Sequence, residues 1–313
     1  MKLIVQIPCY NEEETLPLVL KSIPKKIPGI DKLEVLVIDD GSTDKTIEVA
    51  KKYGVDHFVL HKRNMGLARS FQDGVNKALE LGADILVNTD GDNQYPQEKI
   101  PELIQPIMDS KAEIVVADRQ TQKIAHFSPL KKLLQRFGSY IVNKAAGTNL
   151  PDAASGFRAY SRYSLTRLNV ITQFSYCMET IIQAGNKRLA ITSIPVKTNP
   201  KTRESRLFKN MWHHVFMSMS AIIRAYIMYK PRVVFATLST IFLVAGLAPF
   251  VRFLILALTH NHPGQHLQSL IIGAVLLIGA FLSMALGILA DLIHINRILL
   301  EENLEHIKQK QAQ

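Results

Sequence analysis

Acidic residues cluster directly after three short apolar runs of the chain, in the segments PCYNEEE (8–14), DDGSTD (39–44) and DGDNQYP (90–96). In the third segment a single glycine separates Asp90 from Asp92. Two carboxylates on one turn offer the oxygen ligands that a hard divalent cation prefers. Helix capping and turn formation also place acidic residues there, but they do not require two carboxylates so close together. The sequence therefore predicts a cation site at these segments.

The chain lacks a glycine-rich phosphate loop after its first predicted strand. Neither G-x-x-x-x-G-K-[ST] nor G-x-G-x-x-G occurs there. This disfavours a P-loop NTPase and a dinucleotide-dependent dehydrogenase. A metal-assisted nucleotide-sugar site remains, in which the cation rather than a helix N-terminus faces the diphosphate.

The acidic segments follow strands of a predicted, mostly parallel sheet. Short runs rich in β-branched residues alternate with helical patterns, which is typical of an α/β fold. Helices are predicted at Thr43–Tyr53, behind a Ser42 cap, and at Leu67–Leu81. Ligands of such sheets bind beyond the carboxyl ends of the strands, where the acidic segments lie. The predicted strands are Leu3–Ile7, Leu33–Ile38, His57–Leu60, Ile85–Asn88 and Ile114–Ala117.

Two apolar segments near the C-terminus, residues 233–258 and 267–290, are long enough to span a hydrocarbon core of roughly 30 Å. Buried core helices are the alternative, but such helices seldom run so far without a polar face. The connector 259–266 has no Lys or Arg, whereas Lys230, Arg232 and Arg297 flank the opposite ends. The positive-inside rule therefore places the connector outside and both termini in the cytoplasm. We expect no signal peptide at the N-terminus.

The composition indicates the cellular compartment but does not identify a binding partner. A formal net charge of +10 over 313 residues suits nucleic acid, an anionic membrane or phosphorylated substrates equally well. The two cysteines, Cys9 and Cys177, exclude a disulfide framework and favour a reducing cytosol. His57, His61 and His126 lack the spacing of a zinc site and are interpreted as surface or core residues.

Several motifs in fixed order resemble glycosyltransferase family 2, whose catalytic domain has the GT-A fold. They include PCYNEE, VIDDGSTD, NMGLARSFQDG and NTDGDNQYP. PDAASGFRAY (151–160) and KTRESRL (201–207), followed by two apolar spans, resemble the polyisoprenyl-phosphate branch, the relatives of dolichyl-phosphate mannose synthase and of bacterial undecaprenyl-phosphate glucosyltransferases. The processive-synthase signature Q-x-x-R-W is absent, which disfavours a polysaccharide polymerase.

The resemblance implies roles for residues at the three acidic segments. Asp92 and Gln94 would hold Mg²⁺ or Mn²⁺ against the donor diphosphate, with Asp90 and Asp92 counted among the catalytic residues. Asp152 occupies the position of the family's catalytic aspartate and would orient the acceptor or act as a base, with Glu179 as the alternative. The residues implied to line the nucleotide pocket are Pro8, Tyr10, Asn11, Glu12, Asp39, Asp40 and Asp90.

Basic residues after position 187 suggest a binding site for the phosphate of an acceptor substrate at a membrane. Arg203 and Arg206 are three residues apart, and their guanidinium groups suit bidentate phosphate binding. Arg119 and Arg158 are further candidates for the same phosphate. Apolar stripes in 207–226 and in 130–142 predict amphipathic helices that lie in the headgroups.

These inferences combine into one expected organisation. The chain would have a cytosolic GT-A domain (1–206), a juxtamembrane helix (207–232), two spans (233–291) and a cytoplasmic tail (292–313). It would be a multi-pass plasma-membrane enzyme, metal-dependent and inverting, that moves one sugar from a UDP-sugar or GDP-mannose to a polyprenyl phosphate. We expect no nucleic-acid partner, a homo-oligomer and a downstream flippase. The alternatives are transfer to a diacylglycerol lipid or another hydroxyl, or a non-enzymatic adaptor.

Overall fold

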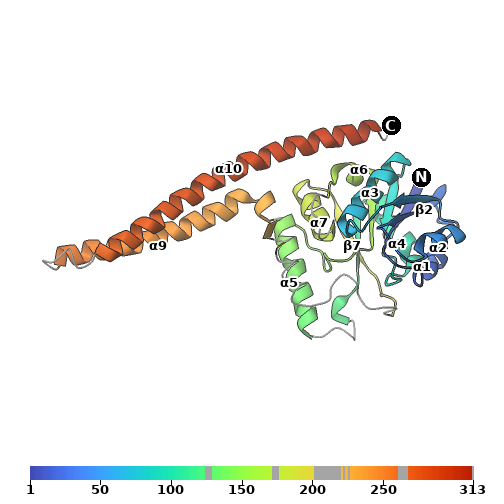
Figure 1. Cartoon of the computed structure of the whole chain (residues 1–313), viewed down its shortest axis with the longest axis horizontal. Coiled ribbons are helices and arrows are strands. Elements are labelled where there is room, and N and C mark those ends of the chain that lie inside the picture. Colours follow the sequence, from blue (N-terminus) through green and yellow to red (C-terminus); the bar gives the residue numbers. More distant parts are fainter. Residues whose placement is uncertain are drawn as a thin grey trace. The chain divides into compact units, whose positions relative to one another are not determined.

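The computed structural model describes residues 1–123, 129–170, 176–200, 220, 223–224, 226–259 and 267–311. The chain forms two compact units, one of residues 1–223 together with 301–313 and one of residues 224–300. The first unit contains the sheet, and the second consists largely of two long helices (Figure 1). The boundary at 223/224 falls within the segment predicted as a juxtamembrane helix.

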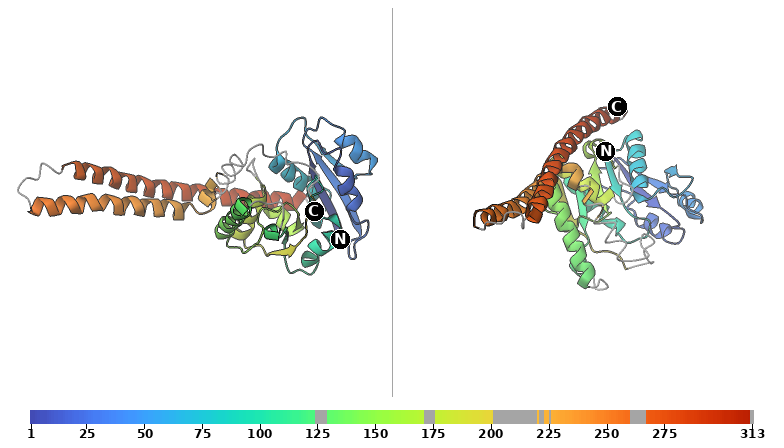
Figure 2. Two further views of the ribbon diagram at one scale, coloured as in Figure 1. Left: turned by 90° about the horizontal axis from the view of Figure 1, so that it is seen from below. Right: turned by 60° about the vertical axis from the view of Figure 1, so that its left-hand side comes forward.

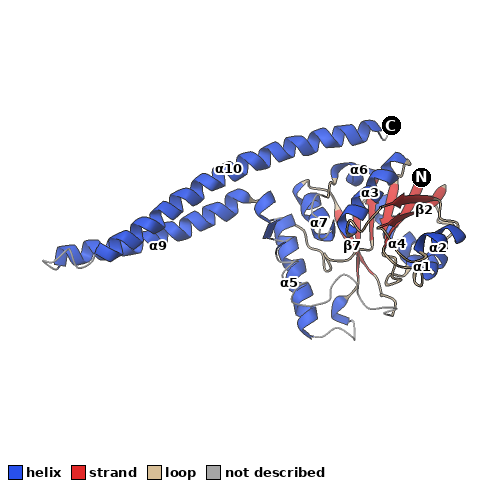
Figure 3. Cartoon of the chain, viewed as in Figure 1, coloured by secondary structure: helices blue, strands red, loops and turns tan. Residues whose placement is uncertain are grey.

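The described residues form one seven-stranded sheet: β1 (Lys2–Cys9), β2 (Lys32–Asp39), β3 (His57–Leu60), β4 (Ile85–Asn88), β5 (Ile114–Asp118), β6 (Arg158–Ser161) and β7 (Ile191–Pro195). Their order is β3-β2-β1-β4-β6-β5-β7. Figure 3 shows the strands in red and the helices in blue. All neighbours are parallel except β6, which is antiparallel to β4 and β5. The predicted mostly parallel sheet is confirmed.

Helices cover both faces of this sheet. α1 and α4 pack on the face that carries Leu3, Val5 and Ile7 of β1, whereas Gly74 of α3 approaches Ile38 on the other face. Seven of the eight β1 residues are buried, which is why this strand reads as an almost continuous apolar run. The helices of the first unit are α1 (Leu16–Ser22), α2 (Thr46–Lys52), α3 (Leu67–Glu80), α4 (Ile100–Met108), α5 (Pro129–Ala146), α6 (Arg162–Arg167) and α7 (Tyr176–Asn186), with 3-10 turns η1 (Gln97–Lys99) and η2 (Thr121–Lys123).

The five predicted strands all occur, but β6 and β7 were not predicted. β6 has the sequence RAYS, which carries no alternating apolar pattern, and it becomes a strand because β4 and β5 pair with it on both sides. The Ser42 cap is wrong. α2 begins only at Thr46, and Ser42 Oγ accepts a hydrogen bond from Asn11 N instead of from a helix amide.

The second unit contains α9 (Pro231–Thr259) and most of α10 (Leu267–Gln311), which lie side by side (Figure 2). Two stretches, Pro231–Leu256 and Gln268–Lys308, are long and apolar enough to cross a membrane, with mean hydropathies of 2.1 and 2.5. A Cβ on Gly273 would lie 2.6 Å from the Phe250 ring, so glycine permits this close approach. Small residues at a helix contact are typical of membrane helices.

The end of α10 docks on the first unit, to which residues 301–313 belong. Glu305 pairs with Arg167 of α6 at 2.7 Å, and Glu301 pairs with Lys187 at 3.1 Å. Lys308 Nζ donates to the carbonyl oxygen of Leu168 (2.9 Å). Because 301, 305 and 308 recur at helical spacing, one face of this helix makes all three contacts. The segment predicted as a tail is therefore a helix anchored at its end to α6 and the residues around α7.

A buried arginine ties β6 to α7. The Arg158 side chain has no exposed surface. Its guanidinium donates to the carbonyl oxygens of Ser155 (2.7 Å), Ala153 (2.8 Å) and Cys177 (2.9 Å) and to Thr180 Oγ1 (2.9 Å). The predicted contact between Arg158 and an acceptor phosphate does not fit this placement, because the side chain is enclosed and engaged by protein oxygens. We assign it a structural role.

Replacing this arginine should destabilise the first unit. We expect Arg158→Met to lower the free energy of unfolding by about 3 kcal/mol, because several buried oxygens lose their donor. For a unit of this size that corresponds to a fall in Tm of roughly 10 °C. Thermal unfolding of the full chain in detergent measures it, with the exposed Arg188→Met as the control. Equal Tm values for the two variants would contradict the structural role.

Candidate active site

The turns after β1 and β2 form one hydrogen-bonded unit at the carboxyl edge of the sheet. Asn11 N donates to Ser42 Oγ (2.9 Å), and Thr43 N donates to Asn11 Oδ1 (2.8 Å). Asn11 has a φ of 57°, a left-handed conformation in which asparagine is enriched. Glu12 N donates to Thr46 Oγ1 at the start of α2 (2.8 Å). These contacts fix the two predicted nucleotide-binding turns relative to each other.

The turn after β4 packs directly against the end of β1. A Cβ on Gly91 would lie 3.2 Å from both Cys9 Sγ and Glu12 Cγ, so the glycine between the two aspartates is what permits this approach. Asp90 and Asp92 are half-buried on either side of it. The structure thus brings the three acidic segments together at one edge, as their positions after parallel strands predict.

Asp39, at the end of β2, has a carboxylate oxygen without a partner. The residue is 5% exposed, and its Oδ2 accepts from Ser42 N (3.2 Å). Its Oδ1 is buried and has no hydrogen-bond partner among the described residues. A buried polar atom left unpaired is costly in a folded protein. The atom is therefore a natural acceptor for a donor group on a ligand.

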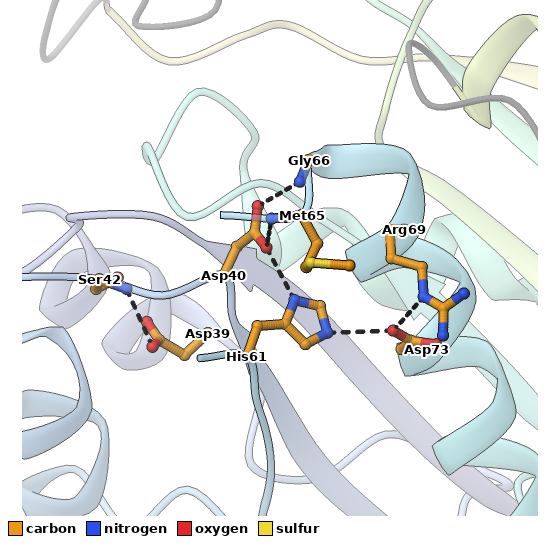
Figure 4. Close-up of polar contacts among 8 residues, drawn as sticks. All are labelled: Asp39, Asp40, Ser42, His61, Met65, Gly66, Arg69 and Asp73. Atoms are coloured by element: carbon orange, nitrogen blue, oxygen red, sulfur yellow. Dashed lines mark hydrogen bonds and ion pairs between the residues drawn. The ribbon is translucent and has the colours of Figure 1, made fainter. Parts of the chain in front are cut away.

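The neighbouring Asp40 is engaged within the fold. Its carboxylate accepts from Met65 N (2.7 Å), Gly66 N (2.9 Å) and His61 Nδ1 (2.8 Å), as Figure 4 shows. The predicted contact of Asp40 with a nucleotide stays a prediction. What the structure shows is that this carboxylate holds the turn between β3 and α3.

Asp152 and Arg119 form a bidentate ion pair at the site. Arg119 Nε lies 2.6 Å from Asp152 Oδ2, and the second contact joins Arg119 Nη2 to Asp152 Oδ1 at 3.0 Å. The Asp152 side chain is 3% exposed and the Arg119 side chain is 10% exposed. Burial opposes the charged form of Asp152, but the guanidinium and its hydrogen bonds hold the pKa of this carboxyl below its usual range. The pair is therefore ionic, and Asp152 is a weak base.

A buried polar network, which the sequence did not reveal, places the loop after Asp152 beside Asp90. Asn88 Nδ2 donates to the carbonyl oxygen of Gly156 (2.9 Å) and to Tyr176 Oη (2.7 Å), while Gly156 N donates to Tyr95 Oη (3.0 Å). A Cβ on Gly156 would lie 3.2 Å from Asp90 Oδ2. The only hint of this network in the sequence was Asn88, a polar residue at the end of the apolar strand ILVN.

The remaining predicted residues are placed as follows. Pro8 is buried within β1, and Tyr10 is 38% exposed at the edge of the site. Glu179 is buried on α7, where its Oε1 accepts from Gln183 Nε2 (3.2 Å). Arg203 and Arg206 lie outside the described residues, as do residues 207–219 of the predicted juxtamembrane helix.

The turn after β4 can contribute to a cation site but does not enclose one. Within the described residues, no group of three or more His, Cys, Asp or Glu side chains is arranged to hold a metal ion. Gln94 N donates to Asp92 Oδ1 (3.0 Å), which fixes that carboxylate. Mg²⁺ commonly binds one or two carboxylates together with water and substrate phosphates. The residues therefore fit a cation that is shared with a bound diphosphate.

The chain has relatives that act on lipid phosphates. It is 30% identical over 213 residues to a UDP-N-acetylglucosamine–dolichyl-phosphate N-acetylglucosaminyltransferase of Methanococcus voltae, covering 61% of this chain and 83% of the relative. It is 31% identical over 176 residues to an undecaprenyl-phosphate mannosyltransferase of Micrococcus luteus, covering 54% and 70%.

Solved structures and a family comparison agree on the fold. Glucosyl-3-phosphoglycerate synthase of Mycobacterium tuberculosis, in complex with Mn²⁺, UDP and glucosyl-3-phosphoglycerate, aligns with a TM-score of 0.53 at 22% identity, covering 72% of this chain and 78% of that chain. The domain of glycosyl transferase family 2 matches residues 4–168, which hold the three acidic turns and Asp152. The sheet thus carries a GT-A fold, and the chain belongs to glycosyl transferase family 2.

Proposed function

We propose that this glycosyltransferase moves one sugar from a nucleotide-sugar, a UDP-sugar or GDP-mannose, to a polyprenyl phosphate at the cytoplasmic face of the membrane. The observation that carries the proposal is the Asp152–Arg119 ion pair. A hydroxyl acceptor needs a general base, for which a paired carboxylate with a lowered pKa is poorly suited. A lipid monophosphate is largely dianionic at pH 7 and attacks without one.

The donor pocket is proposed at the turns after β1 and β2. The unpaired Asp39 Oδ1 would accept a hydrogen bond from an N–H of the nucleobase or from a ribose hydroxyl. Tyr10 at the rim offers a ring for stacking, and the fixed Asn11–Glu12 turn closes the same side. Asp90 lies next to the 152–156 loop.

Asp92 and Gln94 would hold Mg²⁺ or Mn²⁺ at the donor diphosphate. The bound cation would neutralise charge on the leaving nucleoside diphosphate. The chain's own contribution is to keep the Asp92 carboxylate in place, through the Gln94 N–H and through the packing of Gly91 on β1. Solved GT-A neighbours contain Mn²⁺ or Mg²⁺ with UDP, which supports the assignment.

The acceptor phosphate is proposed to meet Arg203 and Arg206. Arg119, a further candidate for this phosphate, is paired with Asp152. Asn199 Nδ2 donates to the carbonyl oxygen of Asn93 (3.0 Å), and Asn199 N donates to that of Gln94 (2.9 Å). The chain that leads into KTRESRL is therefore fastened to the proposed metal turn. Arg203 follows Asn199 by four residues, so chain connectivity alone keeps their Cα atoms within roughly 14 Å.

The surface of α5 supports docking of the catalytic unit on a bilayer. Leu133, Phe137 and Tyr140 recur at helical spacing and are 63%, 48% and 60% exposed. Arg136 and Lys144 are exposed on the same helix. Apolar side chains beside cations suit insertion among anionic headgroups. This face would bring the site to its lipid acceptor.

The direct test is to incubate membranes with radiolabelled UDP-glucose, UDP-GlcNAc or GDP-mannose and undecaprenyl phosphate, and to follow labelled lipid. Asp92→Asn should lower its formation by on the order of 100-fold, because a charged ligand of the cation is lost. The control is Asp109→Asn, because Asp109 is an exposed aspartate at the C-terminal end of α4. Activity of the wild type in excess EDTA would contradict the metal role.

The proposed topology predicts that the connector 259–266 faces away from the cytoplasm. A cysteine introduced by Gln265→Cys should react with an impermeant maleimide in intact cells, because the positively charged flanks stay inside. Cys9 and Cys177 are buried and give little background. Lys52→Cys, at an exposed site on α2, should react only after lysis. If Gln265→Cys also reacts only after lysis, the two-span topology is wrong.

The acceptor class is tested at the two arginines. Arg203→Ala and Arg206→Ala should each raise the apparent KM for the lipid phosphate about 10- to 150-fold, since a charge-assisted hydrogen bond contributes roughly 1.5–3 kcal/mol. Arg→Lys should restore only part of the affinity, because an ammonium group lacks the planar fork. Donor binding, measured by calorimetry, should change little.

The exposed Arg188→Ala is the matched control for loss of one positive charge. Unchanged lipid dependence in both Arg203→Ala and Arg206→Ala would favour a hydroxyl acceptor.

A further inference from the structure

Helix α5 has an exposed apolar side and a buried side. Leu133, Phe137 and Tyr140 are exposed, whereas Ser139 is 7% exposed and Val142 has no exposed surface. An α-helix turns by about 100° per residue, so the two sets lie on opposite sides of its axis. The helix runs along the border of the first unit, where it is drawn in green in Figure 1. One element therefore carries both the surface proposed to meet the bilayer and a buried contact with the rest of the unit.

Two polar side chains of α5 hold the segment around Asp152. Ser139 Oγ accepts a buried hydrogen bond from Ala153 N (3.2 Å). One helical turn later, Asn143 Nδ2 donates to the carbonyl oxygen of Leu150 (2.8 Å), and Leu150 N donates to Asn143 Oδ1 (3.0 Å). Asp152 lies between the two residues that are fastened in this way. The placement of its carboxylate therefore depends on the position of α5.

The same segment and α5 are both packed against α7. A Cβ on Gly185 of α7 would overlap the carbonyl oxygen of Ala146 at the end of α5, so the two backbones touch there. Arg158 donates both to the carbonyl oxygen of Ala153 (2.8 Å) and to that of Cys177 on α7 (2.9 Å). Buried backbone groups are costly to leave without a partner. A shift of α5 must therefore move the segment with it or break these bonds.

We propose that Ser139 and Asn143 are positioning residues that link the bilayer contact of α5 to the placement of Asp152. The inference rests on the proposed function, in which α5 docks on the membrane and Asp152 belongs to the acceptor side. Insertion of Phe137 and Tyr140 among the headgroups fixes the helix. The two polar side chains then hold the segment in the arrangement that transfer needs, so turnover depends on contact of α5 with the bilayer.

The first test removes the two polar side chains in the full chain, reconstituted in phosphatidylglycerol vesicles with undecaprenyl phosphate. Ser139→Ala and Asn143→Ala should each lower turnover at saturating substrates about tenfold, because buried backbone groups beside Asp152 lose their partners. The Kd for UDP-glucose or GDP-mannose in Mg²⁺, measured by calorimetry, should change little, since the turns after β1 and β2 keep their own contacts.

The exposed Asn149→Ala is the matched control within the same loop, and Tm is recorded for every variant. A purely structural role would lower Tm without separating turnover from donor affinity. Ser139→Ala removes a single hydrogen bond, so it still tests the proposal if Asn143→Ala does not fold. Unchanged turnover in Ser139→Ala, or in a folded Asn143→Ala, would overturn the proposal and leave the proposed function intact.

The second test asks whether the two sides of α5 act together. Replacing both Phe137 and Tyr140 by serine removes apolar contact with the bilayer and should also lower turnover about tenfold. Adding Ser139→Ala to this variant should cost little more, because both changes interrupt one connection. A combined loss of about 100-fold, the product of two independent effects, would overturn the proposal. A wild type that transfers neither sugar to undecaprenyl phosphate would overturn the proposed function as well.

Discussion

Parallel pairing of β1 with both β2 and β4 is the constraint on which the site depends. The register sets Cys9 opposite Asp39 and Gln6 opposite Asn88, so the three strands end at one edge of the sheet. Parallel strands share the direction of their carboxyl ends, and the turns that follow them must meet there. Gly91 then lets the turn after β4 touch the end of β1, where any larger residue would be in tight contact.

The carboxylates at this edge of the sheet differ in whether their oxygens have partners within the fold. Asp152 is neutralised by Arg119, and Asp40 is bound by two backbone amides and His61. Asp39, in contrast, keeps one buried oxygen without a partner in the described part of the chain. Like charges that converge in a partly buried site are costly unless each has a counter-charge or a donor. The paired carboxylates hold the turns of this edge in place, and the unpaired oxygen of Asp39 is the one that we propose meets a ligand.

The proposed acceptor side is connected to the same edge through polar side chains. Asn88 and Tyr176 hold the 152–156 loop near Asp90, and Arg158 ties that loop to α7. Asn199 fastens the chain before KTRESRL to the turn that carries Asp92. Proposed donor and acceptor groups thus share one rigid base. In the proposed transfer such positioning would matter, because two anionic substrates have to be held in line against their mutual repulsion.

By itself the sequence determined the fold family, the five principal strands, the three acidic turns and the two long apolar helices. Local apolar periodicity and motif order carry that information, because they record which faces are buried. Only the tertiary structure decided which charged residues serve the fold. Arg158 was predicted to bind a phosphate but is enclosed by protein oxygens, and β6 lacks a strand pattern in its sequence. Their roles are set by partners distant in the sequence, since burial and pairing are properties of the assembled sheet.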